Sequence, residues 1–140
     1  MNHWFGWALL SAVFAAATAV LAKLGVEKTD ANLATAIRTT VVLVFAWAVA
    51  LLGGNTPSLA GLSRREWLFL ALSGLATGLS WLCYFHALQL GPASKVAPVD
   101  KLSVVLVLLF AAFFLGEPLT WRTALGAALI AVGAAILTWR

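Results

Sequence analysis

A few charged or titratable side chains interrupt long apolar runs of this sequence, and their types limit the chemistry they could do: Lys23, Arg38, His86, Asp100 and Lys101. A guanidinium can hold a carboxylate or phosphate through two hydrogen bonds. A histidine, with an unperturbed pKa of about 6.5, can relay protons. The sequence shows no nucleophile–base pair, phosphate-binding loop or metal-ligand spacing. We therefore expect a protein that is not an enzyme and uses no cofactor or metal.

The composition predicts the elements that must position these side chains. The chain has 140 residues, is 63% hydrophobic and 10% charged, and has a mean hydropathy of +0.99. This predicts an all-α, multi-pass protein of the cell membrane, or of the inner membrane if the source is bacterial. The net charge of +4 comes from cations scattered among short loops, which favours contact with lipid headgroups over nucleic acid. Five apolar runs of spanning length are expected as helices of one membrane domain, residues 1–140: about 4–26, 31–52, 67–90, 96–115 and 121–139.

Arg38 is predicted to lie within the membrane. The uncharged run that follows it, Thr39 to Leu52, is fourteen residues long. That is roughly 21 Å of helix, short of the roughly 30 Å hydrocarbon core, so the span must extend back through Arg38. Its guanidinium either binds an anionic substrate group or acts in gating, or it reaches back to the headgroups as an anchor.

Asp100 and Lys101 stand near the start of the fourth apolar run. Pro98 favours a helix start just before them, which would place Asp100 in the first turn, near the positive end of the helix dipole. Neighbouring residues point about 100° apart on a helix, so Asp100 is expected to act in gating by pairing with Arg38 or Lys23. Lys101 would then face another path, where it snorkels, forms an internal salt bridge or contacts substrate.

The remaining candidates include three residues of the third run. Thr77, Trp81 and Tyr84 share one helical face, which forms either a wall for an organic substrate or a packing surface. Trp47 is the other tryptophan expected near mid-membrane and is assigned to the same substrate site. His86 is either a proton relay or a hydrogen-bonded structural histidine. Lys23 acts either in coupling or by stabilising the end of the first helix.

The cations give little indication of orientation. Five spans place three cations on the side of the N-terminus and four on the other, with Arg38 and Lys101 set aside: Arg64, Arg65 and Arg122 against Lys23, Lys28, Lys95 and Arg140. Since such asymmetry sets topology, the chain either inserts both ways or takes its orientation from a partner. Insertion both ways would let two copies pair antiparallel. Gly126 and Gly133, seven residues apart, are the candidate dimer seam, although they could equally serve packing within one subunit.

Several motifs in this order resemble the EamA-like branch of the drug/metabolite transporter superfamily. They lie in two stretches, LAKLGVEKTDANLATAIRT and SWLCYFHALQLGPASKVAPVDKLSVVLVLLFAAFFLGEPLTWRTALGAALIAVGAAILTW. Among them are the Gly-Pro-Ala connection, the proline of VAPV, the LGE that ends the fourth run and the paired glycines of the fifth. The resemblance covers nearly the whole chain.

The resemblance implies a function as well as a fold. Typical members have ten helices, built as two inverted halves around a substrate cavity, and this chain is similar to one half. The implied protein is an antiparallel homodimer that moves a small organic metabolite by alternating access. The related small multidrug resistance family uses a glutamate in its first helix, and residues 4–23 contain none. Two alternatives are a half-size subunit of a heteromeric lipid-carrier flippase and a membrane assembly protein that does not transport.

Overall fold

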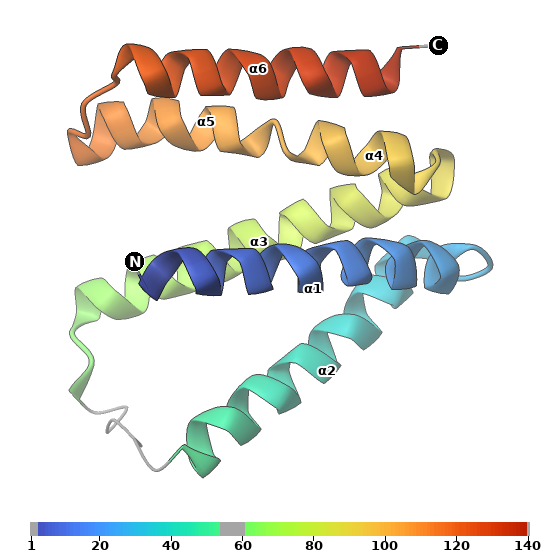
Figure 1. The fold of residues 1–140 in the computed structure, drawn as a ribbon. Coiled ribbons are helices and arrows are strands. Elements are labelled where there is room, and N and C mark those ends of the chain that lie inside the picture. The colour runs from blue at the N-terminus through green and yellow to red at the C-terminus, as the bar shows by residue number, and fades with distance from the viewer. Residues whose placement is uncertain (1–2, 54–60, 140) are drawn as a thin grey trace. The chain divides into compact units, whose positions relative to one another are not determined.

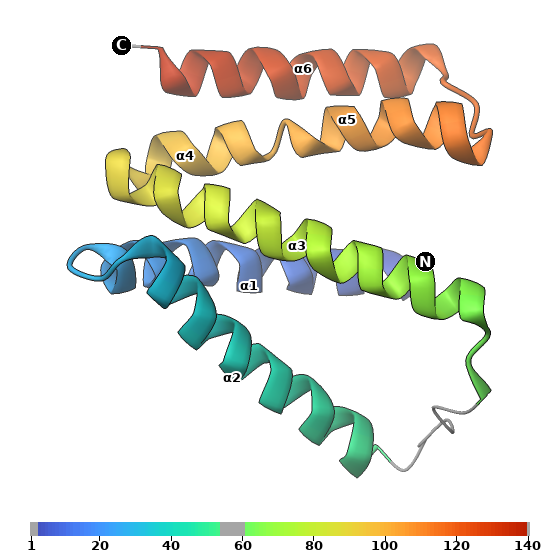
Figure 2. The same cartoon turned by 180° about the vertical axis from the view of Figure 1, so that it is seen from behind.

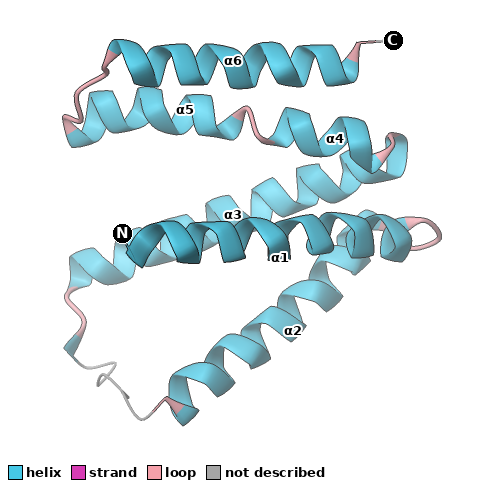
Figure 3. Ribbon diagram, viewed as in Figure 1, coloured by secondary structure: helices cyan, strands magenta, loops and turns pink. Residues whose placement is uncertain are grey.

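The structure is a computed structural model that describes residues 3–53 and 61–139, and these residues form helices joined by short connections (Figures 1 and 3). Five helical segments are long and apolar enough to cross a membrane. The all-α, five-span prediction is therefore confirmed. In chain order the elements are α1 (His3–Val26), α2 (Ala31–Leu52), α3 (Arg64–Leu90), α4 (Ala93–Asp100), α5 (Ser103–Phe110), the π-helical turn η2 (Ala111–Leu115) and α6 (Trp121–Thr138).

Polar caps fix the starts of α2 and α3. The Asp30 carboxylate accepts hydrogen bonds from the backbone N–H groups of Asn32 and Leu33, at 2.9 and 3.1 Å. Ser63 and Glu66 form a capping box, in which Ser63 donates its backbone N–H to Glu66 at 2.7 Å and its hydroxyl accepts from the Glu66 N–H at 3.3 Å. This box starts α3 three residues earlier than the apolar run indicated, because polar residues supply the cap.

The fourth span is two helices instead of the single helix expected over residues 96–115 (Figure 3). Pro98 lies inside α4, where it has no N–H to donate and its ring crowds the preceding turn. After Pro98 some backbone hydrogen bonds span three residues instead of the four of an α-helix. The Leu102 N–H donates to the Val99 carbonyl and the Val104 N–H donates to the Lys101 carbonyl, both at 3.0 Å. The span is therefore interrupted at residues 101–102.

The position predicted for Asp100 is wrong. α4 begins at Ala93, five residues before Pro98, so Asp100 ends this helix instead of lying in its first turn. Because the C-terminal end of a helix carries partial negative charge, the α4 dipole does not stabilise this carboxylate. The error came from treating Pro98 as a helix start, whereas it is tolerated here within a short helix.

Gly116 ends the fourth span. Its backbone is left-handed, with φ of +68° and ψ of 20°, which glycine adopts without steric cost. The following N–H, that of Glu117, donates to the carbonyl of Ala111 at 3.2 Å. The Thr120 hydroxyl then accepts from the Thr123 N–H at 3.3 Å and caps α6. The LGEPLT segment thus turns the chain between two spans.

The chain divides into two compact units, Met1–Lys23 with Leu90–Arg140 and Leu24–Gln89. In the first unit, α4 and α5 run beside α6 in the opposite direction (Figures 1 and 2). Its buried residues are Ala22, Ala111 and Ala134, whose small side chains permit close helix packing. The expectation that residues 1–140 form one domain stays a prediction.

The second unit contains α2 and α3, which pack near the start of α2 and the end of α3. Its buried side chains are gathered there: Val26, Ala31, Thr35, Phe85 and Leu88. Gln89 also donates a 2.7 Å hydrogen bond to the Thr29 carbonyl at this end. Further from this end, residues 39–53 of α2 and its C-cap are exposed except Ala48, and residues 64–80 of α3 are exposed except Gly78.

Candidate functional site

Arg38 lies against aromatic rings of α3. Its Cζ atom is 4.0 Å from the centroid of the Trp81 ring and 5.5 Å from that of Phe85. The arrangement follows from helix periodicity, because Arg38 comes one turn after the buried Thr35 and Phe85 comes one turn after Trp81. The attraction between a guanidinium and an aromatic face reaches about 2 kcal/mol when both are desolvated. The structure thus brings together two predicted site residues, Arg38 and Trp81.

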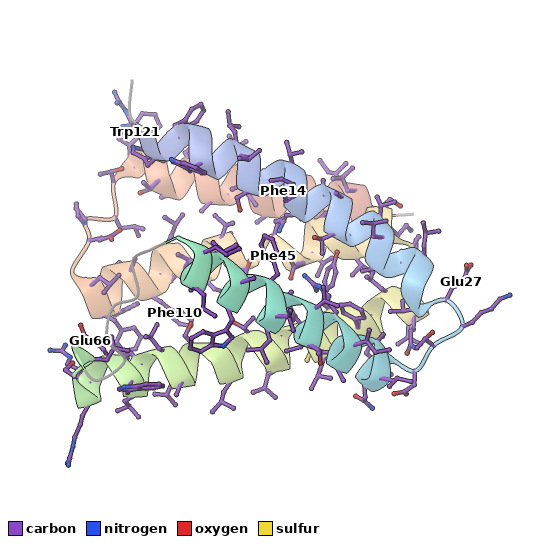
Figure 4. The ribbon with its side chains drawn as sticks, turned by 90° about the horizontal axis from the view of Figure 1, so that it is seen from below. Phe14, Glu27, Phe45, Glu66, Phe110 and Trp121 are labelled. Atoms are coloured by element: carbon purple, nitrogen blue, oxygen red, sulfur yellow. The ribbon has the colours of Figure 1, made fainter. Side chains whose placement is uncertain are left out.

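Carboxylates of the same unit lie at helix ends, away from Arg38. Glu27 lies in the α1–α2 connection and Glu66 at the start of α3, at opposite ends of this unit (Figure 4). Asp30 caps α2 and precedes Arg38 by eight residues, about 12 Å along a helix. Within residues 24–53 and 61–89, aromatic rings and not carboxylates therefore accompany the guanidinium.

The Thr77, Trp81 and Tyr84 positions belong to one uninterrupted helix, as their expected common face requires. Tyr84 follows Trp81 by three residues, about one turn further along α3. Thr77 is exposed and its hydroxyl donates to the Ser73 carbonyl at 2.9 Å, so its oxygen remains able to accept. The sequence interpretation missed Phe85, although its spacing of four from Trp81 could have indicated it. The substrate-binding role of this face stays a prediction.

A second arginine of the same unit contacts an aromatic ring at the start of α3. The Arg65 Cζ atom is 5.7 Å from the centroid of the Phe69 ring, one turn further along the helix. Arg65 is the second residue of α3 and is exposed. It therefore offers an internal reference for Arg38, with similar chemistry at a helix end.

Asp100 and Lys101 pair with each other at the break between α4 and α5. The Lys101 Nζ atom is 3.3 Å from Asp100 Oδ2, and the two side chains are 59% and 37% exposed. Lys101 thus forms an internal salt bridge, one of the three roles expected for it, but with the adjacent Asp100 and not along a separate path. Pairing of Asp100 with Arg38 or Lys23 stays a prediction.

Two further lysines donate to carbonyls near helix ends. Lys23, in the last turn of α1, donates from Nζ to the Gly91 carbonyl at 3.0 Å. Lys95 donates to the Thr138 carbonyl, close to the end of α6, at 3.5 Å. Cations at such positions also interact favourably with the helix dipole. These contacts support the structural interpretation of Lys23, while its coupling role stays a prediction.

For the remaining candidates, no side-chain hydrogen bond, ion pair or ring contact is found among the described residues. Trp47 and His86 are exposed on α2 and α3. Gly126 and Gly133 are half-buried on α6. A Cβ atom added at either position would have no atom of the described residues within 4 Å, apart from the neighbouring backbone of its own helix. A larger side chain is thus not excluded at once by this subunit, which makes both positions useful for testing a dimer. Arg140, counted among the topology cations, lies outside the described residues.

Comparison with known proteins identifies the family. The EamA-like transporter family matches residues 2–139. A Sinorhizobium sp. protein named "uncharacterized transporter in cobO 3′ region" is 54% identical over 136 residues, which cover 97% of this chain and 96% of that protein.

More distant relatives are named as probable 4-amino-4-deoxy-L-arabinose-phosphoundecaprenol flippase subunits ArnE. The Enterobacter sp. (strain 638) protein is 35% identical over 53% of this chain and 69% of its own length. The Yersinia pestis (strain Pestoides F) protein is 37% identical over 51% and 62%. No solved structure matches. The five spans, the family match along nearly the whole chain and the full-length relative establish that this multi-pass membrane protein belongs to the EamA-like transporter family.

Proposed function

We propose that this protein moves a small organic metabolite across the membrane by alternating access and works as a pair of chains. The family and the relative at 54% identity support transport as the activity. The structural observation that carries the proposal is the interrupted fourth span, with Asp100 and Lys101 at the interruption.

An interrupted helix is costly in lipid. Backbone groups that leave the helical pattern need partners, and in membrane proteins they find them in protein or in a water-filled cavity. Lys101 is eight residues from the start of α4, about 12 Å along the helix, and both charged side chains keep exposed surface. Discontinuous helices near the bilayer midplane form substrate and ion sites in many transporters. The N–H groups of Leu102, Val104 and Val105 keep three-residue hydrogen bonds at the interruption, so an aqueous path beside Ser103 and Lys101 would mainly hydrate the two charged side chains.

The pair of chains is proposed as an antiparallel homodimer. The family resemblance implies that one such chain supplies half of a ten-helix transporter. The cations divide three against four between the two sides, which lets the chain insert in both orientations. Two oppositely inserted copies would reproduce the inverted repeat that larger transporters carry in one chain.

A second candidate is a half-size subunit of a heteromeric lipid-carrier flippase. The similarity to the ArnE flippase subunits favours it, at 35 and 37% identity over about half of this chain. This candidate predicts that the purified chain alone is inactive and gains activity with a second half-size protein. The homodimer predicts activity from one chain alone.

Transport and the aqueous path can be tested together. Metabolites that raise the melting temperature of the purified protein would be tested for uptake into proteoliposomes. In a Cys83→Ser background, which removes the single native cysteine, a cysteine at Ser103 should react with a charged thiol reagent. A matched cysteine at Phe113, which is 83% exposed beside the span's end, reports lipid-facing reactivity. Ser103 labelling no faster than Phe113 labelling, together with no uptake of any stabilising compound, would contradict the proposal.

The dimer makes a separate prediction at α6. Gly126→Leu and Gly133→Leu should shift the purified protein from dimer to monomer in detergent, because each places bulk at a seam that needs close approach. Gly74→Leu and Gly78→Leu are matched controls on α3, where an added Cβ also meets no atom within 4 Å. Size-exclusion chromatography with light scattering gives the mass. A dimer that survives both α6 changes would place the seam elsewhere.

A further inference from the structure

We infer that Arg38, held on Trp81, is a binding site for an oxyanion, a carboxylate or phosphate group of the transported molecule or of a lipid headgroup. The inference rests on the proposed function and names the class of ligand. The residues that form this site all belong to one unit, Leu24–Gln89.

The contact with Trp81 holds the guanidinium over the aromatic ring. The Arg38 Cζ atom is 4.0 Å from the ring centroid, which is within the range of a cation–π interaction. A guanidinium directs its five N–H donors outward in its own plane. The contact therefore positions the group without supplying a hydrogen-bond acceptor for these donors.

The donors have no acceptor in the described part of this unit. No hydrogen bond or ion pair joins Arg38 to residues 24–53 or 61–89, where its contacts are with the Trp81 and Phe85 rings. Within the same residues, no side-chain nitrogen or oxygen is both buried and without a partner. The Arg38 nitrogens, which have no hydrogen-bond partner in this unit, are therefore not fully buried.

An accessible, unpaired guanidinium inside a membrane span needs a ligand. Polar groups without partners are unfavourable in the bilayer, so an arginine within a span usually faces protein, water or a ligand. The nearest carboxylate along α2, Asp30, is already bonded to two backbone N–H groups. Since no carboxylate of this unit accompanies Arg38, we expect water or an external anion to satisfy its donors.

The site lies where the packing of α2 on α3 ends. Phe85 is 3% exposed and Leu88 is fully buried on one side of it, whereas the α2 residues after Arg38 are exposed apart from Ala48. The buried side holds the guanidinium in place, and the exposed side admits a ligand. Carboxylate and phosphate match the fork of an arginine in geometry and charge, whereas a cationic ligand would be repelled.

Binding can be measured by thermal unfolding of the full chain in dodecyl maltoside with three probes: sodium benzoate, inorganic phosphate and phosphatidylglycerol. Sodium chloride at equal ionic strength is the control for screening. We expect at least one probe to raise the melting temperature of the wild-type protein. Because charge-assisted hydrogen bonds contribute about 1.5 to 3 kcal/mol, Arg38→Gln should weaken the apparent affinity by about 10-fold or more. Arg65→Gln removes an arginine over Phe69 at a helix end and should leave the affinity unchanged.

Stabilisation by benzoate or phosphate assigns the anion to a small molecule, and stabilisation by phosphatidylglycerol alone assigns it to a lipid headgroup. No stabilisation by any probe, or equal affinity in wild type and Arg38→Gln, would overturn the inference. If Arg38→Gln does not fold, Arg38→Lys is measured instead, because lysine keeps the charge but loses the planar fork of the guanidinium. An Arg38→Lys protein that binds the probe with wild-type affinity would overturn the inference that two guanidinium donors hold the anion. Transport by the wild-type protein is measured independently, so an uptake-competent protein without an Arg38-dependent anion site would refute only this inference.

Discussion

Arg38 and Arg65 belong to the same unit, and each lies over an aromatic ring, yet their surroundings differ. Arg38 is the eighth residue of α2, with its Cζ atom 4.0 Å from the Trp81 centroid, whereas Arg65 is the second residue of α3, 5.7 Å from that of Phe69. A cation at a helix end reaches headgroups and water directly. One that lies a further two turns into a span needs partners supplied by the protein or its ligand. The comparison suggests that depth, and not the aromatic contact itself, separates a functional arginine from an anchoring one.

Lys101 shows a third way to hold a cation in a span. It pairs with a carboxylate, Asp100, where the helix is interrupted. Pairing cancels most of the charge, so this lysine has less to offer an anion than Arg38 has. We therefore expect Lys101 and Asp100 to affect stability and gating more than affinity for the substrate.

The largest expected effect on stability comes from Trp81→Ala. Losing the ring under a half-buried guanidinium should lower the free energy of unfolding by up to about 2 kcal/mol. Phe69→Ala is the matched change under Arg65 and should lower it by about 1 kcal/mol or less, because that contact is longer and exposed. Equilibrium unfolding in mixed micelles gives both values. Equal losses for the two variants would remove the distinction between the arginines.

An intermediate effect is expected for the ion pair. Asp100→Asn should lower the free energy of unfolding by about 1 kcal/mol, since the pair is partly exposed. The double change Asp100→Asn with Lys101→Gln should recover part of that loss, because no uncompensated charge remains. A double-mutant cycle gives the coupling energy. A coupling energy of zero would mean that the 3.3 Å contact between Lys101 and Asp100 does not contribute to stability.

The smallest effect is expected for Arg65→Gln. An exposed substitution away from buried partners changes stability by about 0.5 kcal/mol or less. Thermal unfolding and uptake should both match the wild type. A loss of uptake in this variant would show that Arg65 is more than an anchor and would weaken its use as the control for Arg38.

Composition and periodicity were sufficient to predict the spans. Apolar runs of about twenty residues, separated by polar residues, indicate membrane helices because the bilayer admits little else. α2 matches its predicted range of 31–52. The missed start of α3 shows the limit, since a capping box of polar residues lies outside the apolar run.

The break in the fourth span and the contact between Arg38 and Trp81 could not be predicted in the same way. Pro98 fits the first turn of a helix or a helix interior, and the choice depends on where the preceding residues pack. Arg38 and Trp81 were each selected as candidates, but 43 positions separate them in the sequence. Their pairing depends on how α2 and α3 meet, which periodicity within one helix does not specify.

The central claim is that Arg38 binds an oxyanion, and where that anion is a small molecule, uptake by Arg38→Lys tests the claim most directly. The measurement is the initial rate of proteoliposome uptake of the anion that stabilises the wild-type protein, with Arg65→Lys as the matched control. Lysine keeps the charge but loses the planar fork. We therefore expect Arg38→Lys to fold and to reduce the initial uptake rate by about 10-fold or more, whereas Arg65→Lys should leave the rate unchanged. Wild-type uptake by Arg38→Lys would contradict the account and leave Arg38 as a membrane anchor.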